Sequence, residues 1–229
     1  MTTISAKLQQ VQGRIVTACT AAGRDPASVR LLAVSKTFPA EAVRAAHAAG
    51  QRAFGENYGQ EGVTKIEALA ALRGSLEWHC IGPLQSNKTR PVAEHFDWVH
   101  SIDRLKIAQR LAEQRPAGLA PLQVCLQINV DGGANKSGVA PGEALALARA
   151  VAALPRLRLR GLMAIPEPAP DFIAQHALCM RAAAVFDQIR EAGIELDTLS
   201  LGMSADLEAA IAAGSTMVRV GTAIFGERA

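Results

Sequence analysis

The stretch RLLAVSKTFPAEAVRAAHAAG, residues 30–50, contains the unit from which the fold follows. Its apolar run, residues 31–34, has the length and aliphatic composition of a buried strand. The run ends in the polar residues 35–37, and a helical pattern follows, with Pro39 near its start and Gly50 past its end. A strand followed at once by a helix is the repeating unit of a parallel α/β fold.

The same alternation recurs along the whole chain after a leading helix over residues 4–22. We expect strands over residues 30–35, 52–56, 76–82, 97–101, 122–130, 157–165, 198–202 and 217–225, and helices over residues 39–50, 57–72, 86–96, 103–114, 141–154, 171–193 and 204–214. Eight such units in 229 residues predict one α/β domain, residues 1–229. It would be a (β/α)8 TIM barrel with an extra N-terminal helix. A doubly wound sheet is the alternative, but it needs fewer strands or a break in composition.

Composition excludes several classes of protein. Hydrophobic residues make up 49% and charged residues 20%, which is typical of a globular protein, and the net charge of +3 predicts neither nucleic-acid nor membrane binding. The four cysteines lie far apart without a CxxC pair, so we expect reduced thiols and no metal site. The first residues lack a signal-peptide pattern, and no apolar run approaches the roughly 20 residues of a membrane helix. We therefore expect a cytoplasmic protein.

Lys36 is the first candidate functional residue, because functional groups in such barrels stand at the carboxyl ends of the strands. Partial burial lowers the pKa of a lysine, and the neutral amine can attack an aldehyde. The alternative is a lysine whose stem covers apolar surface while its charged head reaches solvent.

Loops after the seventh and eighth strands offer phosphate-binding chemistry, which barrels often place there. Ser204 precedes a helical pattern as a candidate N-cap, and Gly202 allows close approach of the backbone to a ligand. Gly221 and Thr222 offer an unhindered amide and a hydroxyl. These residues could instead be ordinary caps and turns. Together with a lysine they suggest a phosphorylated aldehyde, of which pyridoxal 5'-phosphate is the common cofactor. A class I aldolase-like sugar-phosphate enzyme is the competing interpretation.

Arg219 favours pyridoxal phosphate, because it shares the strand face of Gly221 and could donate to a pyridine nitrogen. A permanently charged arginine would disfavour protonation of that nitrogen and weaken the ring as an electron sink. Alternatively, Arg219 is structural and pairs with Glu56 or Asp206. Asn57 is either a helix N-cap or a partner of the ring hydroxyl.

Other polar residues give weaker signals. His79 is expected to be a satisfied interior histidine. Lys88, Arg90 and Lys136 are expected to face solvent, with the alternative that Lys88 and Lys136 line the barrel mouth and attract anions.

Seven motifs resemble the pyridoxal phosphate homeostasis (YggS/PROSC) family, over about residues 30–228. They are AVSKTFPAEAVRAA, FGENYGQE, WHCIGPLQSNK, NKSG, RGLMAIP, LSLGMSADLEAAI and VRVGTAIFG. The resemblance implies a fold-type III barrel related to the N-terminal domain of alanine racemase, with the cofactor held as a Schiff base on Lys36. It further implies that Arg219 faces the pyridine nitrogen and that the phosphate is surrounded by Ser200, Met203, Ser204, Gly221 and Thr222.

Two-base racemisation needs an acid/base opposite the lysine. In the related racemase this is a tyrosine from another subunit's C-terminal domain. Here Tyr58 is the only tyrosine, and four residues follow Phe225. We therefore expect a monomeric, non-catalytic protein of vitamin B6 homeostasis that buffers pyridoxal phosphate or delivers it to apo-enzymes, and so influences amino-acid and keto-acid pools. A small racemase or lyase of fold type III is the alternative, and a regulatory barrel with a structural cofactor is a third reading.

Overall fold

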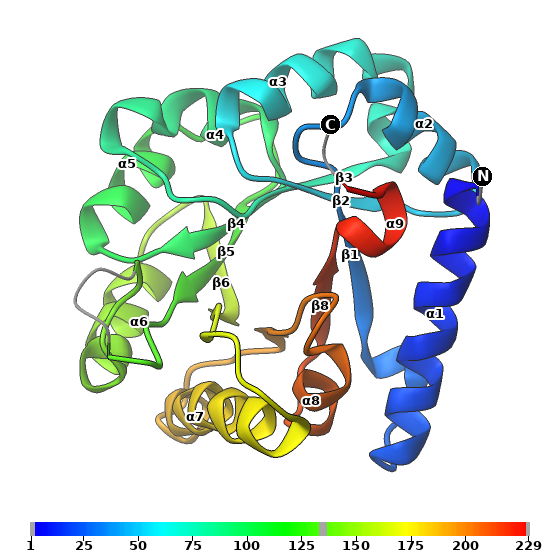
Figure 1. Cartoon of the computed structure of the whole chain (residues 1–229). Helices are drawn as coiled ribbons and strands as arrows, with labels where there is room; N and C mark the ends of the chain where they lie inside the picture. The colour runs from blue at the N-terminus through cyan, green and yellow to red at the C-terminus, as the bar shows by residue number, and fades with distance from the viewer. Residues whose placement is uncertain (1–2, 133–136, 228–229) are drawn as a thin grey trace.

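The computed structural model describes residues 3–132 and 137–227. Over these residues eight parallel strands pair in chain order, and the last pairs with the first, so the sheet closes into a barrel (Figure 1). The strands are β1 (Arg30–Val34), β2 (Ala53–Glu56), β3 (Glu77–Cys80), β4 (Trp98–Ile102), β5 (Leu122–Gln127), β6 (Leu157–Met163), β7 (Thr198–Ser200) and β8 (Met217–Val220). The predicted TIM barrel is confirmed.

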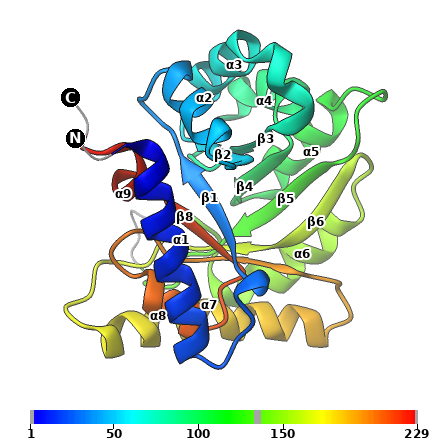
Figure 2. The same ribbon diagram turned by 90° about the vertical axis from the view of Figure 1, so that its right-hand side faces the viewer.

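Helices surround the ring of strands. They are α1 (Ile4–Ala21), α2 (Ala40–Ala48), α3 (Gly59–Ala68), α4 (Thr89–His95), α5 (Leu105–Gln114), α6 (Ala144–Ala152), α7 (Phe172–Glu191), α8 (Leu207–Ala212) and α9 (Thr222–Phe225), with short 3-10 turns η1 (Pro26–Ser28), η2 (Ala70–Ser75), η3 (Ser86–Lys88) and η4 (Pro141–Glu143). The extra helix α1 lies outside the barrel against α8 and α9 (Figure 2). Within the two described ranges, no helix is long and apolar enough to cross a membrane.

Side chains alternate between the two faces of each strand, so every strand packs on both sides. The outward-facing residues form the large core between strands and helices. Inward-facing residues include the apolar cluster of Leu32, Val34, Ala53, Ile81 and Met217. Lys36 comes two residues after Val34, in the turn that follows the strand.

Two of the predicted boundaries that are wrong lie near the candidate phosphate loops. The eighth strand ends at Val220 instead of continuing to residue 225, because Gly221 (φ −114°, ψ −73°) turns the chain into α9. The helix predicted over residues 204–214 begins only at Leu207, with Asp206 at its N-cap position. Ser204 therefore lies in a turn and is not the N-cap.

Candidate functional site

Lys36 lies just beyond β1, and the backbone on both sides of it is fixed. The carbonyl of Ser35 accepts a hydrogen bond from Lys65 Nζ (2.7 Å), and the amide of Thr37 donates to Glu61 Oε1 (2.6 Å). Thr37 adopts φ of 67°, which is unfavourable for a β-branched residue and persists only where its surroundings hold it. Lys36 itself is partly buried. The chain thus holds this residue firmly at the carboxyl end of its strand.

Lys65, which holds the carbonyl of Ser35, also forms a buried ion pair with Glu56. Lys65 Nζ contacts both carboxylate oxygens of Glu56, at 2.9 and 3.0 Å, and Ser35 Oγ donates to Glu56 Oε1 at 2.6 Å. Burial raises the pKa of Glu56, and the charge of Lys65 opposes that rise. Sequence reasoning missed Lys65; the spacing of Glu61 and Lys65, four residues apart on one helix, was the available signal.

Arg219 is buried below the barrel mouth and is held by oxygen acceptors. Its Nη1 donates to the carbonyl and hydroxyl of Ser200 (2.6 and 2.8 Å), and its Nη2 donates to the carbonyl of Ala164 (2.9 Å). Burial lowers the pKa of Arg219 to about 10, so the guanidinium remains charged at neutral pH. Its hydrogen bonds in the described part of the chain go to neither Glu56 nor Asp206, and Asp206 acts on it only through its charge, which opposes the lowering of the pKa by burial.

The loops after β7 and β8 approach neighbouring segments closely at two glycines. Gly202 has φ of 89°, and a Cβ there would lie 2.5 Å from the Cβ of Ala210. A Cβ at Gly221 would lie 3.0 Å from the carbonyl oxygen of Val34 on β1. The amide of Arg219 donates to the carbonyl of Gly202 (2.9 Å), which joins the loop after β7 to strand β8. The ends of β1, β7 and β8 therefore form one side of the mouth.

Of the remaining predicted phosphate residues, Met203 and Ser204 lie in the loop after β7, Thr222 begins α9 after β8, and Ser200 ends β7. The carbonyl of Ser204 accepts from Arg14 Nη2 of α1 (3.0 Å), and the amide of Met203 donates to Asp206 Oδ1 (2.7 Å). Met203 and Thr222 are exposed, and Ser204 is partly buried. The hydroxyl of Ser200, by contrast, points at Arg219 inside the barrel, so its expected place at a phosphate stays a prediction.

Asn57 follows β2 directly, but Tyr58 occupies the N-cap position of α3, so the N-cap alternative for Asn57 is wrong. A Cβ at Gly82 would collide with the carbonyl of Asn57, which shows how closely the loops after β2 and β3 pack. Lys88 is exposed at the end of η3, as expected. Lys136 lies outside the described residues.

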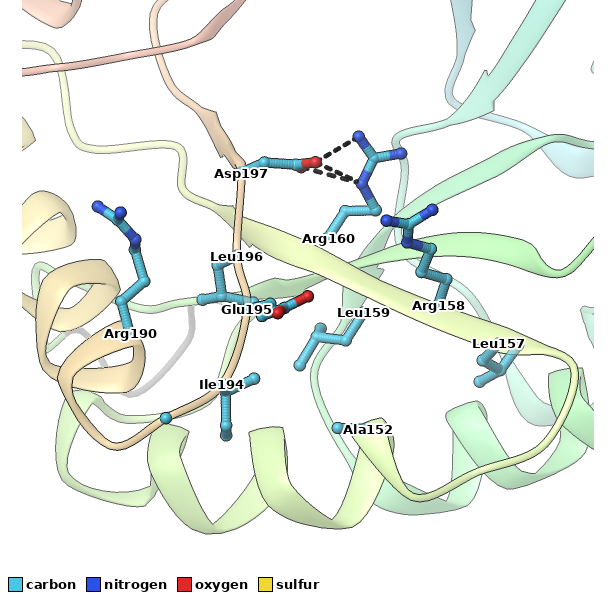
Figure 3. Close-up of a pocket in the computed structure, with 11 residues that line it drawn as sticks. Ala152, Leu157, Arg158, Leu159, Arg160, Arg190, Ile194, Glu195, Leu196 and Asp197 are labelled. Atoms are coloured by element: carbon cyan, nitrogen blue, oxygen red, sulfur yellow. Dashed lines mark hydrogen bonds and ion pairs between the residues drawn. The ribbon is translucent and has the colours of Figure 1, made fainter.

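A cavity of about 750 Å³ lies at the opposite, amino end of β6 and β7 (Figure 3). Its main polar feature is the pair of Arg160 and Asp197, with contacts of 2.6 to 3.0 Å. The amino end of a TIM barrel usually serves stability, whereas the carboxyl end carries the chemistry. We therefore place the candidate site around Lys36 and Arg219 and not in this cavity.

Comparison with known proteins first shows the class of protein to which this chain belongs. The chain matches the family model described as the alanine racemase N-terminal domain over residues 7–229. The alanine racemase of Corynebacterium glutamicum shares the fold, with a TM-score of 0.72 at 19% identity over 96% of this chain and 62% of that chain.

Closer relatives give the family. The pyridoxal phosphate homeostasis protein of Pseudomonas aeruginosa is 63% identical over 100% of this chain and 97% of that protein. The protein of that name from Escherichia coli K12 is 58% identical over 100% of this chain and 98% of that protein. PipY of Synechococcus elongatus, solved with pyridoxal phosphate bound, has a TM-score of 0.84 at 36% identity, covering 97% of this chain and 100% of that chain. The chain belongs to the pyridoxal phosphate homeostasis protein family, as its motifs predict.

Proposed function

We propose that this protein binds pyridoxal 5'-phosphate at the carboxyl end of its barrel and acts in the intracellular homeostasis of that cofactor. In this proposal, Lys36 holds the cofactor covalently through the aldehyde carbon. The observation that carries it is the placement of Lys36 on a clamped turn beside the loops after β7 and β8. The names of the relatives and the ligand of PipY support it.

The donor set fits this cofactor. Lys36 offers an amine for the aldehyde, and Gly221 brings backbone to the mouth where a side chain would crowd Val34. Thr222 and Ser204 add hydroxyl groups on the two loops, with Met203 exposed beside them. When bound, the cofactor supplies an electrophilic carbon and a pyridine ring that can withdraw electrons.

Arg219 would serve the pyridine nitrogen. A guanidinium has five N–H donors, and the contacts within the described residues use three of them. Two N–H groups, one on Nε and one on Nη2, thus remain for a ligand. Because Arg219 stays charged, it would disfavour protonation of the ring nitrogen and so weaken the ring as an electron sink. Asn57, at the end of β2, is assigned to the ring hydroxyl.

The same residues support holding the cofactor over turnover. Tyr58 is the chain's only tyrosine, and it is 63% exposed at the N-cap position of α3. It is therefore a poor candidate for the second acid/base that racemisation requires. We propose a role in buffering the cofactor and delivering it to apo-enzymes, as a single-domain monomer in the cytoplasm, without catalytic turnover.

Borohydride trapping tests the assignment of the lysine. The wild type incubated with pyridoxal phosphate and reduced should carry the cofactor on Lys36, located by peptide mass spectrometry. Lys36→Ala should lose the trapped cofactor, and Lys106→Ala, which removes an exposed lysine of α5, should retain it. Trapping at the same site in Lys36→Ala would show that the assignment is wrong.

Two further assays separate holding from catalysis. Transfer of the cofactor from the loaded protein to an apo-enzyme supports delivery. Sustained deuterium exchange at Cα across a panel of amino acids would instead support a small racemase or lyase. A cofactor that raises the melting temperature but never transfers would support a structural role.

A further inference from the structure

A continuous line of hydrogen bonds crosses the interior of the barrel and ends at Arg219. Glu77 Oε1 lies 2.6 Å from His79 Nε2, and His79 Nδ1 lies 2.9 Å from His100 Nε2. His100 Nδ1 lies 3.2 Å from Ser200 Oγ, which accepts from Arg219 Nη1 at 2.8 Å. We call these five residues the interior chain. Sequence reasoning anticipated a satisfied interior histidine at position 79 but missed its partner His100.

The interior chain joins the two ends of the barrel. Glu77 begins β3 at the amino end, where its carboxylate also pairs with Arg30 at 2.9 Å. His79 is fully buried, and its ring stacks on Trp98 with centroids 5.2 Å apart. Arg219 lies at the other end, below the candidate cofactor site. Charge at the amino end is thus connected to the residue assigned to the pyridine nitrogen.

The chemistry of the groups gives this line one direction. The Glu77 carboxylate only accepts, so His79 donates to it from Nε2 and, as a neutral ring, accepts at Nδ1 from His100 Nε2. The neutral ring of His100 has its one N–H on Nε2, so its Nδ1 accepts the hydroxyl hydrogen of Ser200, whose oxygen accepts from Arg219 Nη1. Burial lowers the pKa of both histidines, and contacts with His79 and Arg30 lower the pKa of Glu77 to about 2, although burial opposes this. At neutral pH two neutral rings therefore connect an arginine to a carboxylate.

We propose that His79 and His100 are positioning residues that orient Arg219 for the cofactor ring, with Glu77 as the anionic end of the line. Ser200 accepts from Nη1 with both its hydroxyl and its carbonyl oxygen, which fixes the plane of the guanidinium. Its two remaining N–H groups are thereby kept available for a ligand. This inference rests on the proposed cofactor site, since it assigns how that site holds its arginine.

Histidine tautomers test the direction of the line without any cofactor. Two-bond 15N–1H correlation spectra of 15N-histidine-labelled protein at pH 7 should show both rings protonated on Nε2 only. Single-histidine variants, His79→Gln and His100→Gln, assign the signals. Protonation on Nδ1 at either ring would overturn the proposed direction. Because this readout needs no ligand, it stands even if pyridoxal phosphate fails to bind.

Cofactor binding tests the positioning role. His100→Phe interrupts the line in a fully buried place and should weaken the affinity for pyridoxal phosphate about tenfold, with a shifted absorption band of the bound cofactor. His100→Gln, which keeps a donor and an acceptor, should recover most of that loss. Cys19→Ala, which alters a fully buried residue of the outer helix α1, should match the wild type in affinity and spectrum.

Equal affinity and spectrum in His100→Phe and Cys19→Ala would overturn the proposal. If His100→Phe does not fold, Glu77→Gln gives the same test from the partly exposed end of the line. That variant removes the anionic charge at nearly constant shape, and it should weaken binding about threefold and shift the absorption band. If the wild type itself does not bind pyridoxal phosphate, the proposed function fails, and the tautomer result still decides the direction of the line.

Discussion

Around Lys36 the chain holds the backbone with neighbouring side chains. Ser35 and Thr37 are each tied to a residue of α3, through Lys65 and Glu61. A lysine has about 2 kcal/mol of rotamer entropy to lose on immobilisation. Fixing the turn before a ligand arrives reduces how much further ordering binding requires.

Breaking the buried pair of Lys65 and Glu56 should destabilise the fold. Lys65→Met leaves the carboxylate of Glu56 buried with Ser35 as its remaining partner, and we expect a loss of about 3 kcal/mol in the free energy of unfolding at pH 7. The loss should shrink toward pH 5, because the pKa of Glu56 is raised and the folded variant takes up a proton that the unfolded chain does not.

Urea unfolding of Lys65→Met and of the exposed control Lys106→Met measures this effect. The control should stay within about 0.5 kcal/mol of the wild type. Equal free energies of unfolding in Lys65→Met and Lys106→Met would show that the pair of Lys65 and Glu56 does not stabilise the fold.

At the scale of elements, the sequence predicts the loops after β7 and β8 as phosphate loops but misjudges their shape. Asp206 stands at the N-cap position of α8 without a side-chain capping bond, because its carboxylate accepts from the amide of Met203 in the preceding turn. Ser204 is held from α1 by Arg14. A helix more than 180 residues earlier in the chain cannot be paired with this loop from local patterns. Local sequence thus locates the loops, and tertiary contacts set where the helix begins.

Gly202 should tolerate no side chain. Gly202→Ala combines a positive φ of 89° with a contact of 2.5 Å to Ala210, and we expect a loss of stability of about 2–4 kcal/mol. Gly13→Ala is the matched control, because no heavy atom of the described residues outside its own helix lies within 4 Å of a Cβ there. In the middle of α1 it should add about 0.5–1 kcal/mol. Thermal unfolding compares them, and a stable Gly202→Ala would refute the close approach.

Arg14 should affect the cofactor more than the fold. Its side chain is 37% exposed and pairs with Glu208 and the carbonyl of Ser204, so Arg14→Met should cost at most about 1 kcal/mol of stability. Release of the carbonyl should loosen the loop after β7 and speed cofactor dissociation several-fold, measured by stopped-flow absorbance. Arg104→Met, which removes a pair with neighbouring Asp103, should leave the rate unchanged. Equal rates of cofactor dissociation in Arg14→Met and Arg104→Met would show that Arg14 does not affect cofactor binding.

At the scale of the whole molecule, the strand order could be predicted, whereas the contacts across the interior could not. Alternating apolar runs and helices imply a closed ring of neighbouring strands, and the structure has that order. His79 and His100 come from adjacent strands, but His100 meets Ser200 across a separation of 100 residues. Which inward side chains meet depends on register and on the bulge between Val99 and Ile102, neither of which the pattern specifies.

Burying two neutral histidines should make the barrel sensitive to mild acid. The unfolded chain protonates its histidines near pH 6.5. Burial lowers the pKa of His79 in the folded state, and it lowers the pKa of His100 more strongly. The nearby charges of His79, Arg219 and Arg30 lower the pKa of His100 further. Above pH 6.5 neither state takes up these protons. Below it the unfolded state binds them, so stability should fall by up to about 1.4 kcal/mol per pH unit for each histidine. Glu77 adds a further loss between its unfolded pKa of 4.5 and its folded value of about 2.

Urea unfolding at pH 7.5, 6.5 and 5.5 measures the slope. The wild type should hold its stability down to about pH 6.5 and then lose roughly 1–2 kcal/mol by pH 5.5, and His100→Gln should remove about half of that loss. His176→Gln, on the outer helix α7, controls for removal of a histidine and should keep the wild-type profile. If the free energy of unfolding of the wild type stays constant down to pH 5.5, the folded state must take up these protons as readily as the unfolded chain does. His79 and His100 would then be charged in mild acid, and the proposal of two neutral rings between Glu77 and Arg219 would be wrong.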